Sequence, residues 1–302
     1  MTRSHVENLR LRARIIQAIR VFFESERFLE VETPLRIPAN APEEHIEPIR
    51  SGDQYLHTSP ELCMKRLLCR GHNRIFQICH CWRGEERGRR HIPEFTMLEW
   101  YRSHSDYEDL MNDCERLLRF IANTCLSTNT ICYETNHIVL NKEFSRVTVR
   151  SAFNQYAGAK MEEAVSNGSF DEIMVTHIEP ALVRDRPLLL MDYPIEMAAL
   201  ARPKPGDPSV AERFELYAGG LELANGFSEL NDPIEQRVRF QMANQNRMKN
   251  RLPALPIPEP FLNELAVMPP SAGIALGVDR LVMLLAGVSR IEEVIAFTPE
   301  DM

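Results

Sequence analysis

The chain has 302 residues, of which 44% are hydrophobic and 26% are charged, and its formal net charge at pH 7 is -8. This composition is typical of a globular protein that is large enough to bury a full core. No apolar run approaches the roughly 20 residues that span a membrane, and the N-terminus has no signal-peptide pattern. The acidic balance argues against extensive contacts with nucleic acid, whose binders usually carry a basic face. We therefore expect a cytoplasmic protein without membrane contact.

The cysteines agree with a reducing compartment. There are seven, an odd number, and their spacing does not repeat as it would in a disulfide framework. Cys79, His80 and Cys81 are consecutive, but on an alternating strand His80 points away from the two cysteines. Since no second Cys-x-x-Cys cluster completes a tetrahedral set, the sequence does not favour a structural zinc site.

In the first part of the chain, apolar residues at helical spacing predict amphipathic helices over residues 6–27, 58–69 and 106–126. The second of these helices is expected to start with a capping box formed by Thr58 and Glu61, with Pro60 in its first turn. Between the second and third helices, residues 74–85 and 95–101 read as the two strands of a long hairpin.

In the second part of the chain, residues 128–180 are less regular, and short helices are expected over residues 148–158 and 161–178. A buried strand should stop near Pro194, and a loop is expected at PKPGDP. Residues 212–230 predict two strands joined by Gly219-Gly220, a common hairpin signal. Further on, the pattern predicts a long polar helix over 232–251, a proline-rich connection, and a strand that passes into a helix ending at Gly287.

Hairpins surrounded by helices, without regular strand–helix alternation, predict an α+β fold with a largely antiparallel sheet. We expect a single domain over residues 1–302 with a helical insertion at about 128–180. The sequence contains neither a Walker motif nor a G-x-G-x-x-G fingerprint, so neither of the two common phosphate-binding loops is available.

Residues 82–101, WRGEERGRRHIPEFTMLEWY, join an arginine-rich loop to an alternating strand. Arg83 has the parity of Cys79 and Cys81 on the first strand, while Phe95, Glu99 and Tyr101 share a parity on the second. If both sets face one side, Arg83 is placed to clamp a phosphate by two parallel hydrogen bonds, and a purine is placed to stack on Phe95. A solvent-exposed hairpin tip is an equally weighted alternative.

Two other segments carry charges that need partners. Arg280 lies in the first turn of a helix whose dipole already favours anions, so its partner is either a ligand or an acid such as Asp279. Glu222 and Glu229 are two acids in an otherwise small and apolar strand, and buried carboxylates need counter-charges. The pair could hold Mg²⁺ together with phosphate oxygens, or either acid could bind a substrate amine. The alternative is one acid at a turn and one at an edge.

FLEVETP, WRGEERGRRHIPEFTMLEWY, GLELANGFSEL and GIALGVDRLVML occur in this order and resemble the class II aminoacyl-tRNA synthetase catalytic domain, the lysyl subgroup in particular. The resemblance runs from about residue 8 to residue 299. We expect no anticodon-binding domain, because Met1 lies only a few residues before the first helix. The pattern is most similar to that of a truncated group of the family, the elongation factor P–(R)-β-lysine ligases.

The resemblance implies ATP and Mg²⁺ as cofactors and (R)-β-lysine and elongation factor P as partners. It implies amino-acid contacts by Ser59, Pro60, Glu61, Tyr101 and Glu229. It implies ATP contacts by Arg83, Gly84, Glu85, Ile92, Phe95, Glu222, Leu223, Gly277 and Arg280. Of these residues, Arg83 and Arg280 would be catalytic, and Glu222 with Glu229 would hold Mg²⁺. Residues 28–34 would lie at a homodimer interface.

The chain departs from the family pattern at two positions. Ile92 replaces an asparagine that contacts ATP in the family, and the lost hydrogen bond should cost about 1 kcal/mol. Gly84 stands where asparagine is frequent. Ala275 agrees with the alanine that these ligases carry in place of a glycine, and it fits a substrate whose amine sits one carbon further out.

The resemblance implies a reaction in two steps. The β-lysine carboxylate attacks the α-phosphorus of ATP, and the resulting adenylate is attacked by the ε-amine of a lysine on elongation factor P. One alternative is an enzyme that charges tRNA, which the acidic composition mildly opposes. Another is a catalytically silent paralogue that acts as a regulatory binding module, which the retention of Arg83, Glu222, Glu229 and Arg280 opposes.

Overall fold

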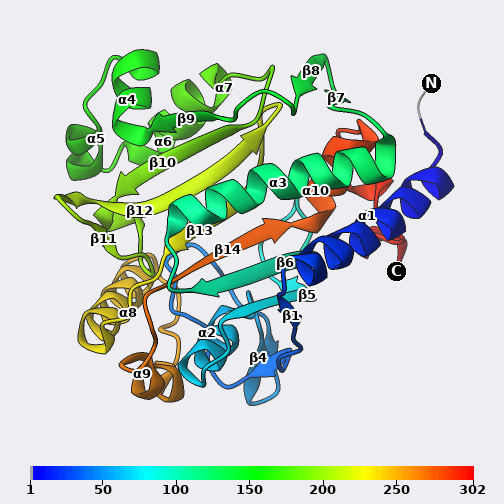
Figure 1. Cartoon of the computed structure of the whole chain (residues 1–302). Coiled ribbons are helices and arrows are strands. Elements are labelled where there is room, and N and C mark those ends of the chain that lie inside the picture. Colours follow the sequence, from blue (N-terminus) through cyan, green and yellow to red (C-terminus); the bar gives the residue numbers. More distant parts are fainter. Residues whose placement is uncertain (1–2) are drawn as a thin grey trace.

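The computed structural model describes residues 3–302 and is built around one large mixed sheet (Figure 1). Its main path runs through β1 (Leu29–Glu30), β5 (Arg74–Trp82), β6 (Glu94–Ser103), β14 (Ser271–Gly277), β13 (Leu221–Ser228), β12 (Asp207–Ala218), β10 (Leu188–Pro194) and β9 (Ser145–Thr148). The pairs from β5 to β10 are antiparallel, while the two outermost pairs, β1–β5 and β9–β10, are parallel. The expected α+β fold with a largely antiparallel sheet is confirmed.

Smaller elements surround this sheet. The short strands are β2 (Arg36–Ile37), β3 (Arg50–Ser51), β4 (Gln54–Leu56), β7 (Thr130–Tyr133), β8 (Asn136–Val139) and β11 (Pro203–Lys204). The longer helices are α1 (His5–Ser25), α2 (Glu61–Cys69), α3 (Tyr107–Leu126), α8 (Pro233–Lys249), α9 (Glu259–Leu265) and α10 (Val278–Ala286). The short helices of the insertion include α4 (Val149–Ala152), α5 (Met161–Asn167), α6 (Phe170–Ile173) and α7 (Glu179–Ala181). None of the helices in residues 3–302 has the length and apolar character that crossing a membrane requires.

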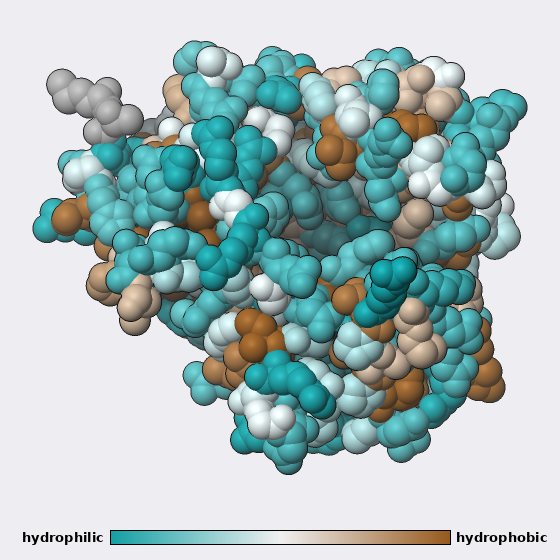
Figure 2. Space-filling model, turned by 180° about the vertical axis from the view of Figure 1, so that it is seen from behind, coloured by the Kyte–Doolittle hydropathy of each residue, from teal (hydrophilic) through white to brown (hydrophobic). Residues whose placement is uncertain are grey.

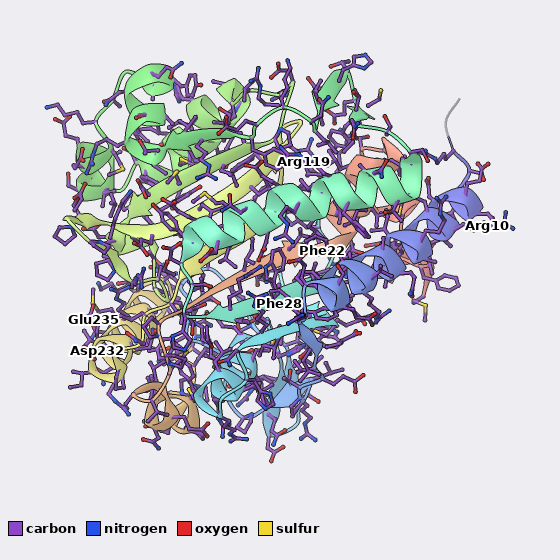
Figure 3. The ribbon with its side chains drawn as sticks, in the orientation of Figure 1. Arg10, Phe22, Phe28, Arg119, Asp232 and Glu235 are labelled. Carbon is purple, nitrogen blue, oxygen red and sulfur yellow. The ribbon has the colours of Figure 1, made fainter. Side chains whose placement is uncertain are left out.

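The main core lies between the sheet and the helices α1 and α3, which run side by side over one of its faces (Figure 1). Phe23 of α1 stacks on Phe76 of β5, with 4.8 Å between the ring centroids. Phe22, labelled in Figure 3, contacts Phe120 of α3 at 5.7 Å between centroids. Because this face of the sheet is covered by apolar side chains, the opposite face is the one free to carry a polar site.

Most predicted helices are confirmed, but the start of α2 is not as expected. The helix begins at Glu61 behind Pro60, and no capping box forms between Thr58 and Glu61. Thr58 instead bonds to Asn40: the side-chain oxygen of Asn40 accepts a hydrogen bond from the Thr58 amide at 2.9 Å. The Ser59 hydroxyl accepts from the Glu61 amide at 3.0 Å. The T-x-x-E pattern does not show whether another residue, here Asn40, will bind the expected capping threonine.

The glycine pair between β12 and β13 forms the predicted hairpin. Gly219 and Gly220 have φ values of 62° and 80°, which is the region that a two-residue type I′ turn requires. The two strands pair from Arg213 opposite Phe227 to Ala218 opposite Leu221, with a register shift near Tyr217. This shift matters for the site because it changes which side chains of β13 face each side of the sheet.

The inserted segment contains more strand than the sequence indicated. Its short helices are present, but β7 and β8 form a small hairpin and β9 joins the large sheet. The segment has its own apolar cluster, in which Phe153 and Phe170 stack at 5.1 Å between centroids. The expected loop at PKPGDP is largely paired, as β11 and the start of β12. Four-residue strands without clear alternation give too little pattern to be predicted.

A buried ion pair ties the sheet to α3. Arg102 of β6 donates two hydrogen bonds of 2.6 Å to the carboxylate of Asp113, which also accepts from the Trp100 indole at 3.3 Å. Asp113 is only 2% exposed and Arg102 only 8%. Each charge therefore compensates the other for the hydration that both lose on folding.

We expect Asp113→Ala to lower the free energy of unfolding by about 3–5 kcal/mol, because it leaves the Arg102 guanidinium buried without a partner. Chemical denaturation measures this loss. Glu108→Ala is the matched control, since Glu108 is exposed on the same helix, and it should change stability by less than about 0.5 kcal/mol. Equal stability of the two variants would contradict the assigned role.

Candidate active site

A cavity of about 310 Å³ opens on the face of the sheet opposite α1 and α3. Figure 2 shows it as a deep recess in the middle of the back of the molecule, surrounded largely by hydrophilic residues. Its walls come from β6, β13 and β14, from the first turn of α10, and from the loop that follows β5. The arginine loop and the last strand–helix junction, far apart in the sequence, therefore meet at one cavity.

The register of the β5–β6 hairpin confirms the parity expected from the sequence. Cys81 pairs with Phe95, Cys79 with Met97, and Gln77 with Glu99. Phe95, Met97, Glu99 and Tyr101 all line the cavity. One strand therefore carries a sequence of side chains from an aromatic ring at one end to a carboxylate and a phenol at the other.

The end of the cavity near Phe95 contains the arginines. The Arg83 guanidinium lies 5.2 Å from the centroid of the Phe95 ring and donates to Glu86 at 3.2 Å. Arg280 donates to the backbone oxygen of Glu222 at 2.9 Å and to its carboxylate at 3.1 Å. Two guanidinium groups and an aromatic ring at one end of a cavity suit a nucleotide phosphate and its base.

Of the acids considered as partners of Arg280, Glu222 is the one that it contacts, and Asp279 is not. Asp279 instead accepts from Arg12 of α1 at 2.5 Å and from the backbone amide of Thr96 at 2.8 Å. It therefore anchors the start of α10 to α1 and β6. This leaves the guanidinium of Arg280 on the cavity side of the helix, where it lines the wall.

The other end of the cavity contains carboxylates. Glu99 accepts hydrogen bonds from the Ser59 hydroxyl, at 2.7 Å, and from the Tyr101 hydroxyl. Lys65 of α2 is fully buried and forms ion pairs with Glu61, at 2.6 Å, and with Glu229. Acids therefore outnumber the cations that neutralise them, and this end of the cavity suits a ligand with positive charge.

Burial gives these carboxyls unusual acidity. Loss of water, and after it the charge of neighbouring Glu61, raise the pKa of Glu99 to about 8. Burial also raises the pKa of Glu229 to about 8, although Lys65 opposes the shift. Glu43, which also lines the cavity, has its pKa raised to about 7 by burial against the opposing effect of Arg83. Such shifts are typical of functional sites.

The floor of the acidic end requires a residue without a side chain. A Cβ atom on Gly273 would collide with the Tyr101 ring and with a carboxylate oxygen of Glu229. Gly273 pairs with Tyr101 across the β14–β6 ladder, and Ala275 pairs with Glu99. The small residues of β14 therefore leave space in front of the polar groups of β6.

The cavity collects most of the residues expected from the sequence. Those that line it are Ser59, Glu61, Arg83, Ile92, Phe95, Tyr101, Glu222, Leu223, Gly277 and Arg280. Glu229 lies directly behind Gly273. Like Glu229, three more expected residues are outside the lining: Pro60 is the buried N-cap of α2, the Gly84 amide donates to Glu47 at 2.8 Å, and Glu85 is exposed. The neighbouring Glu86, and not Glu85, lines the cavity and pairs with Arg83.

Several lining or supporting residues were missed by the sequence reasoning. Glu43, Glu86, His91 and Asn225 line the cavity, and Lys65 closes its acidic end. Only Lys65 left a usable signal, because it follows Glu61 by four residues and shares its face of the helix. The others sit in loops or beside a strand irregularity, where spacing does not determine direction.

The expected Mg²⁺ pair must be corrected. Glu222 and Glu229 lie at opposite ends of β13, and seven residues of strand separate them by about 20 Å. Glu229 is paired with Lys65, whereas Glu222 lines the nucleotide end. Mg²⁺ often takes only one or two carboxylates and is otherwise held by phosphate oxygens and water. Glu222 alone fits such a site.

Comparison with known proteins agrees with this geometry. Residues 1–301 match the model of the family described as tRNA synthetases class II (D, K and N). The chain is 39% identical to the elongation factor P–(R)-β-lysine ligase of Erwinia tasmaniensis, with 97% of this chain and 95% of the relative covered. It is 40% identical to the ligases of the same name from Edwardsiella ictaluri, with 97% and 95% covered, and Pasteurella multocida, with 98% and 96% covered. The chain therefore belongs to the class II tRNA synthetase family and, within it, to the group of the elongation factor P–(R)-β-lysine ligases.

Proposed function

We propose that the chain is an ATP-dependent ligase that activates (R)-β-lysine as an adenylate and transfers it to a lysine side chain of elongation factor P. The observation that carries this proposal is the polarity of a single cavity. One end has arginines and an aromatic ring, and the other has buried carboxylates. The names of the relatives supply the identity of the amino acid and of the protein acceptor.

The acidic end supports a substrate with two ammonium groups. Glu61, Glu99 and Glu229 meet there, and Lys65 is the cation that neutralises part of their charge. A carboxylate oxygen of Glu229 has no hydrogen-bond partner among the described residues, although it faces the floor at Gly273. An ammonium group would satisfy that oxygen and supply the missing charge. A neutral amino-acid side chain would leave that oxygen without a partner and the negative charge without compensation.

The arginine end supports the activation step. The substrate carboxylate must attack the α-phosphorus while negative charge builds on the phosphate oxygens. Arg83 and Arg280 point into this end from two different elements, so their charges are fixed before the reaction begins. Phe95 offers its ring to the adenine base. A Mg²⁺ ion held by Glu222 would add charge neutralisation at the phosphates.

No covalent enzyme nucleophile is needed for the transfer step. The ε-amine of the acceptor lysine attacks the carbonyl carbon of the adenylate, and AMP leaves with the electrons of the broken bond. The role of the chain is to hold the two reacting groups together and to exclude water. Glu43, whose pKa of about 7 allows both charge states near neutral pH, lies close enough to Arg83 to respond to its charge.

Ile92 lines the cavity and also packs against the main core. It therefore replaces the hydrogen bond of the family asparagine with apolar contact. His91 and Arg90 line the same end of the cavity and offer polar groups close by. Binding of ATP is thus expected despite the substitution. The homodimer expected at residues 28–34 stays a prediction; Leu29, 53% exposed at the sheet edge, supports it.

Activity with a panel of substrates tests the proposal directly. We expect ATP–pyrophosphate exchange with (R)-β-lysine and weaker exchange with lysine, since the acidic end selects two ammonium groups. Purified elongation factor P should then gain the mass of one β-lysine. Exchange with neither amino acid would refute the activation step. Labelling of tRNA without labelling of the factor would favour a tRNA-charging enzyme.

Arg83→Ala should lower the rate of pyrophosphate exchange by at least about 100-fold, because one preorganised charge at the phosphates is lost. Arg87→Ala is the matched control: Arg87 belongs to the same loop but is exposed and pairs with Glu300. Its exchange rate should stay near that of the parent protein. Circular dichroism of both variants checks folding. Full activity in a folded Arg83→Ala variant would exclude a role at the phosphates.

Binding of β-lysine should release protons near pH 7. Burial raises the pKa values of Glu99 and Glu229 to about 8, so both carboxyls are partly protonated in the free protein. Ammonium groups favour the ionised carboxylates, and affinity should rise between pH 6 and pH 8 by up to about tenfold per pH unit for each proton released. Calorimetry in two buffers of different ionisation enthalpy measures the proton count.

Glu229→Gln provides the control for this experiment, because it removes one titrating group from the same end of the cavity. Its complex should release fewer protons than that of the parent protein at pH 7. A parent protein that binds β-lysine with identical enthalpy in both buffers would show that the carboxyls are already ionised, contrary to the expectation.

A further inference from the structure

Two cysteines and one histidine form a cluster that the proposed reaction does not use. Cys79 and Cys81 are alternate residues of β5, so both side chains leave the same face of the strand. His57 reaches the same place from the segment between β4 and α2. In the part of the chain that the structure describes, one ligand atom from each of the three residues lies within 4.8 Å of the other two.

The distances in the cluster are close to those of a metal site. The two sulfur atoms are 3.9 Å apart, and the sulfur of Cys81 is 3.8 Å from Nε2 of His57. Tetrahedral zinc has bonds of about 2.3 Å to sulfur and about 2.0 Å to nitrogen, which separate neighbouring ligand atoms by about 3.5–3.8 Å. The three ligand atoms therefore stand near three corners of such a tetrahedron.

The cluster is buried. The exposed fractions of Cys81, His57 and Cys79 are 0%, 1% and 9%. Nε2 of His57 lies 2.7 Å from the backbone oxygen of His80. To bind a metal through Nε2, His57 would exchange this hydrogen bond for the metal bond.

Gln77 supplies a fourth polar group next to the cluster. It precedes Cys79 by two residues on the same face of β5 and is 2% exposed. Its side-chain oxygen is buried without a hydrogen-bond partner among residues 3–302. Buried polar atoms are seldom left unpaired, so this oxygen or a water molecule is available for the remaining corner of a tetrahedral site.

A disulfide between Cys79 and Cys81 is a poorer use of the same residues. Residues two apart on an extended strand have Cα atoms about 6.6–6.8 Å apart, at the limit that a disulfide tolerates. Both residues are also paired across to β6, which resists the backbone movement that a bond would need. Metal binding requires no such movement, because the ligand atoms already stand near their final spacing.

We propose that His57, Cys79 and Cys81 form a binding site for a thiophilic closed-shell metal ion, Zn²⁺ or Cu⁺. Two thiolates and an imidazole select these soft or borderline ions over Mg²⁺, which requires oxygen ligands. The site lies beside the nucleotide end of the cavity, since Cys81 pairs with Phe95 and Cys79 with Met97. Binding of the ion needs no assumption about the reaction.

Titration of the metal-free full chain with Co²⁺, a spectroscopic substitute for Zn²⁺, tests the site. We expect one Co²⁺ per chain with strong sulfur-to-cobalt charge-transfer absorption, and displacement of Co²⁺ by added Zn²⁺. Competition with a Cu⁺ chelator tests the second ion. Cys79→Ser and Cys81→Ser should each abolish the absorption and weaken binding by more than about 100-fold. No stoichiometric binding of either ion would overturn the proposal.

Cys132→Ser is the matched control. Cys132 is exposed and its sulfur lies 3.4 Å from Nδ1 of His137, so it is a second thiol–imidazole pair of the kind that binds metal loosely. This variant should keep the absorption; its loss there, or its survival in the β5 variants, would overturn the assignment. His57→Gln keeps both thiols, and we expect it to retain sulfur absorption with at least tenfold weaker binding. Circular dichroism checks that each metal-free variant is folded.

Discussion

The position of β6 between β5 and β14 is the constraint on which the rest of the molecule depends. Side chains alternate along a strand, so Leu98 and Trp100 enter the main core while Phe95, Glu99 and Tyr101 face the cavity. A slip of one residue would place a tryptophan in the cavity and a carboxylate in the core. Packing of Trp100 against α1 and α3 on the apolar face therefore determines which groups of β6 line the cavity on the other face.

The excess of buried carboxyls at the acidic end destabilises the free protein locally. Lys65 is fully buried between Glu61 and Glu229, and Glu99 is held only by hydroxyl groups. Burying carboxyls with too few cations raises their pKa values, so the free protein retains protons there that it would lose in water. In the proposed function, a substrate with two ammonium groups would supply the absent positive charge. Part of its binding energy would then come from neutralising carboxylates that lack a counter-charge in the free protein.

The sequence was sufficient for features that follow from periodicity. Alternation on β5 and β6 predicted which side chains share a face, and the glycine pair predicted the β12–β13 hairpin. Position within a loop carries no such period, which is why Glu86 and not Glu85 meets Arg83. The distance between Glu222 and Glu229 was misjudged for another reason. Both acids belong to one motif, but a strand extends by about 3.3 Å per residue, so closeness in a motif is not closeness in space.

His57 is a further residue whose role could not be predicted from the spacing of the sequence. Alternation along the strand predicted that His80 points away from Cys79 and Cys81. This is correct, since His80 is exposed and contacts Glu94. The histidine that does meet the two thiols is more than twenty positions earlier, in a segment without regular spacing. Only the pairing of distant segments reveals it.

The selectivity of the acidic end depends on β14 as much as on the acids themselves. Gly273 stands opposite Tyr101 and Ala275 opposite Glu99, so the size of these two residues determines how far a substrate can descend toward the polar groups. A Cβ on Gly273 would displace the Tyr101 ring and would crowd Glu229. The methyl group of Ala275 occupies space in front of Glu99 that a glycine would leave open. The shape of the acidic end is thus determined by two small residues of a strand that carries no charge.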